Sequence, residues 1–211
     1  MRLEEAKKEL VKYSRMLAEK NLVVSSGGNI SFISAGRVYV TATGIALDEI
    51  TIDDLAVLDL AGNLINNLKP SKEAGMHLAI YKKKEVKVII HAHPFYSTVV
   101  ASHRDIRSEQ DIPCYTPGYV VKVGQLGLIG YYQPGSQELS AAVTRSIAKH
   151  QGVLMRNHGV IVAGEDFRQV FNLIEDIEVN ARLFLEYGNV MAPLSSKEIK
   201  ALQSRRGGEG S

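Results

Sequence analysis

The alternation of apolar and polar residues divides the chain into segments of helical and of strand periodicity. Residues 3–20 carry apolar side chains at near-helical spacing with charges between them, which predicts an amphipathic first helix. The segments 31–34 and 37–43 are short and rich in β-formers, and Ala35 and Gly36 between them predict a hairpin. Further helices are predicted over 71–84, 95–102, 136–149 and 165–187. Further strands are predicted over 56–60, 63–65, 86–93, 119–124 and 152–164, the last with a break at Gly159.

These elements predict one α/β domain over residues 1–190. Strands joined by hairpins and interleaved with helices indicate a mixed or largely antiparallel sheet with helices on its faces. The chain shows neither an internal repeat nor a linker long enough to separate two domains. Residues 191–211 are polar and end in glycines, so we expect a flexible C-terminal tail with at most one weak helix.

Composition narrows the possible partners. Of the 211 residues, 25 are Lys or Arg and 23 are Asp or Glu, and a net charge of +2 argues against nucleic acid as a partner. No apolar run approaches the roughly 18 to 20 residues of a membrane span, and no secretory signal is visible. The single cysteine, Cys114, excludes an internal disulfide and fits a reducing compartment. We therefore expect a cytoplasmic protein without a membrane partner.

The histidines of two predicted strands indicate a metal site. His91 and His93 stand two residues apart, so both side chains point to the same face of their strand and can converge on one divalent ion. His158 ends another apolar run, and the glycine after it suits a third ligand. Three neutral imidazoles with an open coordination position are typical of catalytic zinc. Among the remaining histidines, packing is expected for His77, and solvation at charged helix ends for His103 and His150.

Three loops of small residues have the composition of anion-binding sites, although each is also a plausible turn. They offer glycine amides, hydroxyls, a side-chain amide and one ammonium, and together they could hold one phosphate if they converge. Glu73 follows the third loop, either as a carboxylate that favours a helix N-terminus or as a general base beside a metal. The loops are Gly27-Gly28-Asn29, Thr43-Gly44 and Ser71-Lys72.

Five short motifs occur in a fixed order along most of the chain. From about residue 3 to residue 188, the chain resembles the class II aldolase/adducin family, most closely its L-fuculose-1-phosphate aldolases. The resemblance implies an α/β/α sandwich around a central, mainly antiparallel sheet, and a homotetramer with active sites at subunit interfaces. The motifs are GGNIS (27–31), TATG (41–44), PSKE (70–73), HAHP (91–94) and RNHG (156–159).

The resemblance also implies roles for individual residues. It implies that His91, His93 and His158 bind Zn2+, or another divalent metal such as Mn2+ or Co2+, and that Glu73 is the acid/base residue. Adducin-type members lack the metal histidines, so their presence here favours an active enzyme. The phosphate of the substrate would then be held by the three loops, through Gly28, Asn29, Thr43, Gly44, Ser71 and Lys72.

The reaction implied is cleavage of a ketose 1-phosphate to dihydroxyacetone phosphate and a small aldehyde such as lactaldehyde, through a metal-stabilised enediolate. Lys72 departs from the P-S-S-E sequence of the fuculose-phosphate aldolases and could instead serve a substrate carboxylate. A sugar-acid-phosphate decarboxylase or a pentulose-phosphate 4-epimerase therefore remains an alternative, as does a non-catalytic metal-binding scaffold. Those aldolases also use a tyrosine of the neighbouring subunit, and Tyr115 and Tyr119 are candidates without an assignment.

Two unrelated folds with paired histidines fit less well. Metallo-β-lactamase-like hydrolases need an HxHxDH run, whereas Pro94 and Phe95 follow His93 here. Cupins place a glutamate a few residues after the pair, and none occurs before Glu109.

Overall fold

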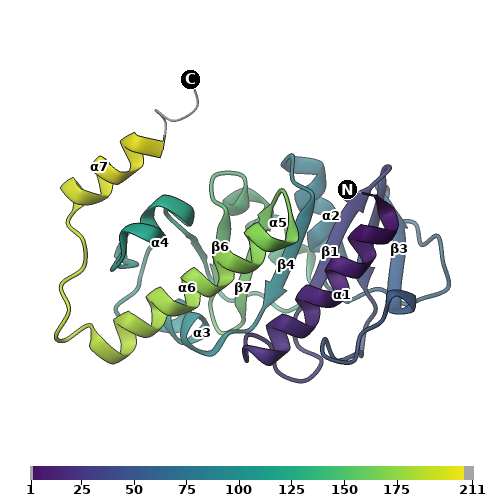
Figure 1. Ribbon diagram of the computed structural model, residues 1–211, viewed down its shortest axis with the longest axis horizontal. Helices are drawn as coiled ribbons and strands as arrows, with labels where there is room; N and C mark the ends of the chain where they lie inside the picture. Colours follow the sequence, from purple (N-terminus) through teal and green to yellow (C-terminus); the bar gives the residue numbers. More distant parts are fainter. Residues whose placement is uncertain (1, 207–211) are drawn as a thin grey trace.

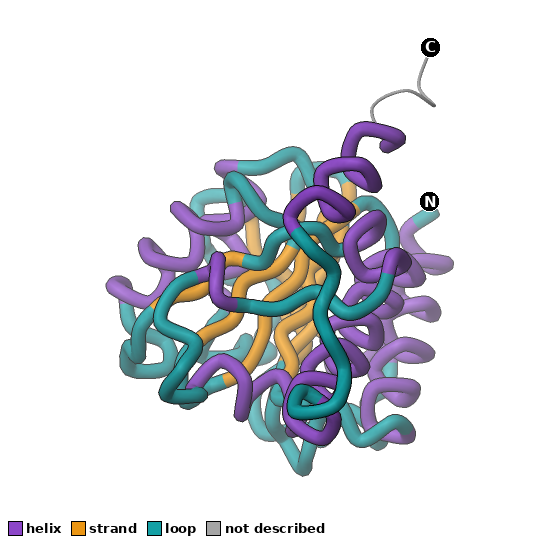
Figure 2. The backbone as a smooth tube through the Cα atoms, turned by 90° about the vertical axis from the view of Figure 1, so that its left-hand side faces the viewer, coloured by secondary structure: helices purple, strands orange, loops and turns teal. Residues whose placement is uncertain are grey.

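The computed structural model describes residues 2–206, which form three layers with a sheet between two layers of helices (Figures 1 and 2). The helices are α1 (Leu3–Glu19), α2 (Ala74–Lys83), α3 (Phe95–Ser102), α4 (Pro117–Lys122), α5 (Gln137–Ile147), α6 (Phe167–Tyr187) and α7 (Ser196–Arg206). The strands are β1 (Asn29–Ser34), β2 (Arg37–Thr41), β3 (Leu55–Asp59), β4 (Val88–Ala92), β5 (Gly127–Ile129), β6 (Gly152–Met155) and β7 (Gly159–Gly164).

Within the described range, the seven strands form a single sheet in the order β3-β2-β1-β4-β7-β6-β5. Neighbouring strands pair antiparallel except β5 and β6, which run parallel. The predicted α/β sandwich around a mainly antiparallel sheet is therefore confirmed. The predicted hairpin is also confirmed, with Ala35 and Gly36 in an exposed turn between β1 and β2.

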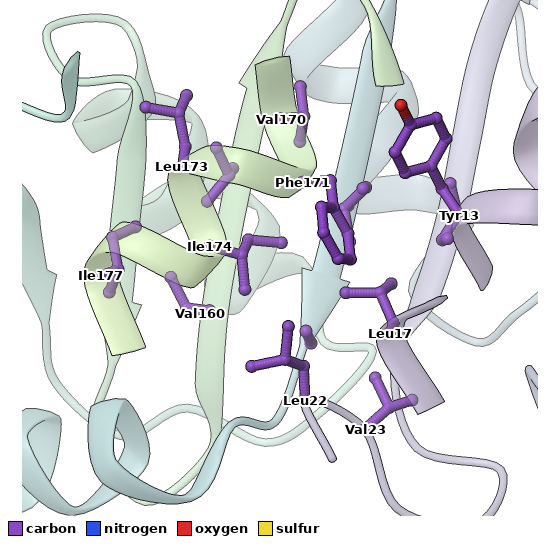
Figure 3. Packing of buried hydrophobic residues seen from close by; sticks show 14 of the residues in the cluster. Tyr13, Leu17, Leu22, Val23, Val160, Val170, Phe171, Leu173, Ile174 and Ile177 are labelled. Atoms are coloured by element: carbon purple, nitrogen blue, oxygen red, sulfur yellow. The ribbon is translucent and has the colours of Figure 1, made fainter. Parts of the chain in front are cut away.

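The two faces of the sheet have separate cores. Helices α1, α3 and α6 pack on one face, where Phe32, Phe167 and Phe171 are among the largest fully buried side chains. Figure 3 shows the α6 side chains of this core facing Tyr13, Leu17 and Val160. Helices α2 and α5 pack together on the opposite face, over a smaller apolar core. Because strand residues alternate, each central strand contributes to both cores.

Residues 119–124, predicted as a strand, instead lie largely in helix α4. The run Tyr119-Val120-Val121 has strand composition, but Pro117 stands at the first helical position and Thr116 caps the helix by accepting a hydrogen bond from the Tyr119 N–H. A capped start with proline at its first position favours a helix over the local β-propensity.

The predicted strand 152–164 is two strands. β6 and β7 pair antiparallel, and residues 156–158 reverse the chain between them. Asn157 adopts a left-handed backbone conformation with φ of 53°, which asparagine tolerates better than most residues. The break therefore precedes Gly159, and His158 lies in the turn rather than at a strand end.

Three smaller differences concern element boundaries and edges. The predicted strand 63–65 reduces to a single bridge between Leu64 and Leu58. β5, which the sequence analysis missed, is three residues long and pairs only at the edge of the sheet. The helix predicted from residue 71 begins at Ala74, so that Glu73 is its N-cap residue.

The predicted tail contains helix α7, which packs against α4. Residues 207–211 of that tail lie outside the described residues. Over residues 2–206, none of the helices combines the length and apolar character needed to cross a bilayer.

Candidate active site

The ends of four strands meet at one end of the sheet. β1, β4 and β7 are neighbours, and antiparallel pairing places the start of β1 and the start of β7 beside the end of β4. Asn29 lies opposite His91 in the β1–β4 pair, and Ala92 lies opposite Val160 in the β4–β7 pair. The end of β2 lies beside the start of β1. Segments distant in sequence therefore contribute to one site.

This arrangement brings the three predicted metal histidines together. One ring nitrogen of each of His91, His93 and His158 lies within 4.8 Å of the corresponding atoms of the other two. The Nε2 atoms of His91 and His93 are 2.8 Å apart. His91 is fully buried on its strand, whereas His93 follows the end of β4 and is partly accessible. The three rings are thus close enough for one ion to contact all of them.

Hydrogen bonding fixes the tautomer of His91. Its Nδ1 lies 2.9 Å from the carbonyl oxygen of Val160. Because a carbonyl only accepts, Nδ1 carries the hydrogen of this contact, and the ring is oriented with Nε2 toward His93 and Glu73. A second partner that orients the ring in this way is typical of metal-ligating histidines.

Glu73 lies among the same rings. Its Oε2 is 3.1 Å from His91 Nε2, and its Oε1 is 3.3 Å from His158 Nε2. Asn29 Nδ2 donates a 3.0 Å hydrogen bond to Oε2. Burial alone would raise the pKa of Glu73, but the imidazoles of His91 and His158 outweigh burial and hold this pKa well below its usual range. Burial lowers the pKa of His93 to about 3, so that His93 is neutral near pH 7.

These contacts fit a cation among the rings. His91 Nε2 lies 3.1 Å from Glu73 Oε2 and 2.8 Å from His93 Nε2, so three atoms that can donate to a metal converge. Among the described residues, Glu73 Oε1 and His158 Nδ1 are buried without a hydrogen-bond partner. Three imidazoles beside one carboxylate are a donor set suited to a divalent transition metal. The residues present therefore fit the metal that the sequence predicts.

Two glycines hold the ring of His93 in a narrow slot. A Cβ atom at Gly27 would lie 2.9 Å from His93 Nδ1, and one at Gly159 would lie 2.7 Å from His93 Cδ2. Gly28 has φ of +80°, and a Cβ there would lie 2.7 Å from the His91 carbonyl oxygen. The glycines of the GGNIS and RNHG motifs thus allow the backbone to approach the histidines closely, a packing role that the sequence analysis did not separate from anion binding.

The three predicted anion loops converge on one pocket. The Thr43 N–H donates to the Lys69 carbonyl and the Ser71 N–H donates to the Thr41 carbonyl, which holds the second and third loops together. A cavity of about 440 Å3 is lined by all three loops together with Glu73, His93 and His158. The predicted residues in its wall are Gly28, Asn29, Thr43, Gly44, Ser71 and Lys72. Their roles toward phosphate remain predictions.

Two of the loop residues also make contacts within the protein. Asn29 is buried and donates its amide to Glu73, and the Ser71 hydroxyl accepts from the Glu73 N–H at 3.3 Å. Lys72 is exposed, and within residues 2–206 its side chain makes no hydrogen bond or ion pair. Lys72 thus lines the pocket as an exposed cation without a partner among the described residues.

A column of buried polar side chains connects α2 to β1 behind Glu73. His77 Nδ1 lies 2.7 Å from the Ser31 hydroxyl, which lies 2.8 Å from the Tyr81 hydroxyl. Glu73, His77 and Tyr81 are four residues apart on α2 and therefore share a face of the helix. Burial lowers the pKa of His77 to about 3, and its role is packing through hydrogen bonds, as expected for this position.

Other candidate residues lie elsewhere. Tyr115 and Tyr119 are buried in their own chain, so the structure adds no support for either as a donor to a neighbouring site. His103 stacks edge-on against Phe184, and His150 is largely buried and contacts Ser146, so neither is simply solvated as predicted.

Comparisons with known proteins give the family. Residues 8–185 match the family model of the class II aldolase and adducin N-terminal domain. The chain belongs to the class II aldolase and adducin family. A 3-oxo-tetronate 4-phosphate decarboxylase of Haemophilus influenzae is 37% identical over 95% of the chain and 97% of its own length. An L-fuculose phosphate aldolase of Methanocaldococcus jannaschii is 33% identical over 85% of the chain and 95% of its own length.

A solved structure supports the same family. YgbL of Klebsiella pneumoniae, described as a candidate aldolase/epimerase/decarboxylase, superposes with a TM-score of 0.91 at 31% identity, covering 96% of this chain and 99% of that one. Class II aldolases are divalent-metal-dependent lyases, and the three histidines described above are positioned to bind such a metal. This class II aldolase-family chain is therefore a metal-dependent lyase.

Proposed function

We propose that this enzyme is a zinc-dependent decarboxylase of a four-carbon 3-oxo sugar-acid phosphate, of the 3-oxo-tetronate 4-phosphate type. The observation that carries the proposal is that one pocket is lined both by the histidine–glutamate cluster and by three anion-type loops. The greater identity to the Haemophilus decarboxylase than to the Methanocaldococcus aldolase supports loss of CO2 over aldol cleavage. Aldol cleavage of a ketose 1-phosphate, the main prediction from the sequence, is thus less supported than decarboxylation, which was an alternative there.

The two reactions share one intermediate. In a 3-oxo-tetronate 4-phosphate, breaking the C1–C2 bond releases CO2 and leaves the electron pair on C2, next to the C3 ketone. The resulting enediolate takes a proton at C2 and becomes dihydroxyacetone phosphate. Aldol cleavage of a ketose 1-phosphate reaches the same enediolate with an aldehyde as the leaving group. Stabilisation of this anion is therefore the common requirement.

The residues of the site have distinct tasks in this chemistry. A divalent ion held by His91, His93 and His158 would supply a Lewis acid for the ketone oxygen. Glu73, buried and oriented by the amide of Asn29, is ionised near neutral pH and would relay to C2 a proton taken from solvent.

The phosphate would lie against the loops. Thr43, Gly44 and Ser71 provide hydroxyl and backbone N–H donors on one wall of the pocket. This remote group supplies binding energy that positions the reacting carbons. Lys72 then remains for the substrate carboxylate, the group that an aldolase substrate lacks.

Product analysis tests the reaction. We expect CO2 and dihydroxyacetone phosphate from 3-oxo-tetronate 4-phosphate, with kcat/KM at least about 100-fold above that for aldehyde release from L-fuculose 1-phosphate. Both products are measured on zinc-loaded enzyme whose metal content is known. The reverse preference would overturn the decarboxylase assignment and restore aldol cleavage.

A Lys72→Ser variant tests the assignment of Lys72. If its ammonium holds the carboxylate, KM for the sugar-acid phosphate rises by about tenfold or more, because a hydrogen bond to a charged group is lost. Inhibition by dihydroxyacetone phosphate, which has a phosphate but no carboxylate, then stays within about twofold. Equal weakening of both ligands would assign Lys72 to the phosphate instead.

We also propose that the enzyme is a homotetramer, as the family resemblance implies. The side chains of Val24 and Phe95, which neighbour the Gly27 loop and His93 in sequence, are 72% and 69% exposed in the single chain. Large exposed apolar side chains beside a site suit a subunit contact. Light scattering should give four times the 23.2 kDa chain mass. A monomer with full activity would refute this proposal.

A further inference from the structure

Helix α3 begins directly after the metal-site residue His93, and its own sequence does not cap it. Pro94 is the N-cap residue and makes no side-chain cap hydrogen bond. The first N–H groups of a helix have no partner within the helix and need acceptors from elsewhere. The N-terminus of α3 therefore depends on another element of the fold.

Glu178 of α6 supplies the missing cap. Its Oε1 accepts from the Tyr96 N–H at 2.8 Å, and its Oε2 accepts from the Ser97 N–H at 2.8 Å. The Ser97 hydroxyl also donates to Oε2. A carboxylate that takes three donors at a helix N-terminus is favoured both by charge-assisted hydrogen bonds and by the helix dipole.

Glu178 lies on a part of α6 that is packed against the core. Ile177, next to Glu178, is 2% exposed, and the α6 side chains before it form much of the larger core (Figure 3). On the other side, only Pro94 and Phe95 separate His93 from the capped residues, and proline fixes its own φ. A shift of α3 would therefore move His93 within the slot between its two glycines.

We propose that Glu178 is a positioning residue for the metal site, which fixes the start of α3 and thereby holds His93 at the distance and angle that metal binding requires. This inference rests on the proposed function, because it assumes that His93 is a metal ligand. Residues that orient metal ligands commonly affect metal affinity by about 10-fold to 100-fold when they are changed.

The test is the affinity of the metal-free, full-length protein for Zn2+ alone, measured by competition with a chelator. In Glu178→Gln the side chain keeps its size, but the amide nitrogen is a donor that faces another donor. We expect Zn2+ affinity to fall by about tenfold. Ser97→Ala removes one of the three contacts and keeps the charge of Glu178, so a smaller loss of Zn2+ affinity is expected. This variant replaces Glu178→Gln in the test if Glu178→Gln does not fold.

Glu186→Gln is the matched control. Glu186 lies two turns further along the same helix and also contacts α3, but it does so through the Tyr96 hydroxyl rather than through the backbone. Its change should leave Zn2+ affinity within about twofold. Unchanged affinity in both Glu178→Gln and Ser97→Ala, or an equal loss in the control, would overturn the role of Glu178.

The absorption spectrum of the Co2+-loaded form is a second readout, because it reports ligand geometry, which a purely structural role of Glu178 would leave unchanged. We expect Glu178→Gln to alter this spectrum and Glu186→Gln to reproduce that of the wild type. A wild-type protein that takes up neither ion would instead overturn the metal-dependent function proposed above.

Discussion

The two faces of the central sheet are built from the same strands but are used differently. On the face covered by α1 and α6, alternate residues such as Ile30 and Ile90 enter an apolar core with stacked aromatic rings. On the opposite face, their neighbours Asn29 and His91 contact Glu73, the N-cap residue of α2, and Ser31 contacts His77 of α2. Consecutive residues of one strand therefore point to opposite faces, so that one enters the apolar core and the next enters the polar site.

This division has an energetic consequence. Of the buried side-chain atoms without a hydrogen-bond partner in the described residues, four belong to the cluster around Glu73, namely those of Asn29, Glu73, His77 and His158. Unpaired buried polar groups are costly in free energy, so the site is maintained by packing elsewhere. We expect substitutions of the groups that line the pocket mainly to change activity, and those of the apolar side chains under α6 mainly to change stability.

The largest expected effect follows from removing a metal ligand. His93→Ala leaves two imidazoles, and we expect the zinc content of purified protein to fall to near zero and kcat/KM to fall at least about 1000-fold. The fold should persist, because His93 is partly accessible and follows the end of β4. Elemental analysis and circular dichroism check both parts. A zinc-free variant with wild-type activity would disprove the metal role.

Glu73→Gln separates metal binding from proton transfer. The amide keeps the size of the side chain but can neither accept nor pass on a proton, so we expect zinc to be retained and kcat to fall by about 100-fold to 10,000-fold. Steady-state kinetics with elemental analysis on the same sample measures this. Unchanged turnover would remove Glu73 from the mechanism.

Phe171→Ala examines the opposite face. Phe171 is 2% exposed between α6 and the sheet, and removing its ring leaves a cavity that should lower the free energy of unfolding by about 3 to 5 kcal/mol. At a temperature where the variant is folded, kcat should stay within about twofold. A loss of kcat as large as that of Glu73→Gln would contradict the division between the faces.

Two serine substitutions, one on each face of the sheet, should give the smallest difference in the free energy of unfolding. Ser31→Ala removes the hydroxyl to which His77 and Tyr81 are hydrogen-bonded, and should lower the free energy of unfolding by about 1 to 3 kcal/mol. Ser14→Ala, in α1, removes a buried hydroxyl that has no partner among the described residues and should be close to neutral. Urea unfolding of both variants measures the difference. Equal losses would show that the two buried serines have the same energetic role.

Most elements were predictable from the sequence because their signals are local. Residues 3–20 and 165–187 carry sustained helical periodicity, and the structure has helices at both places. The strand predicted over 119–124 was wrong because the cap of Thr116 and Pro117 outweighs the β-propensity of valine. β5 was missed because its pairing partner is more than twenty residues away and no local pattern marks it.

The site was predictable only in part. The spacing of His91 and His93 indicates convergence, and the five motifs identify His158 and Glu73 as their companions. The contact of Asn29 with Glu73 depends on strand register and on the position of α2, which no motif encodes. The cap that Glu178 provides joins residues about eighty positions apart, and only the packed fold brings them together.

The turn between β1 and β2 has a practical use. Asn29 begins β1 at the end of the sheet where the three histidines meet, and Ala35 and Gly36 follow its last residue, so roughly 17 Å of strand separates the turn from this cluster. Both turn residues are exposed. Ala35 already carries a side chain at its φ of 48°, whereas Gly36 has φ of +73°, which side chains rarely adopt. A fluorescent label or a surface tether attached at position 35 should leave catalysis intact, which makes it a suitable handle for immobilising the enzyme.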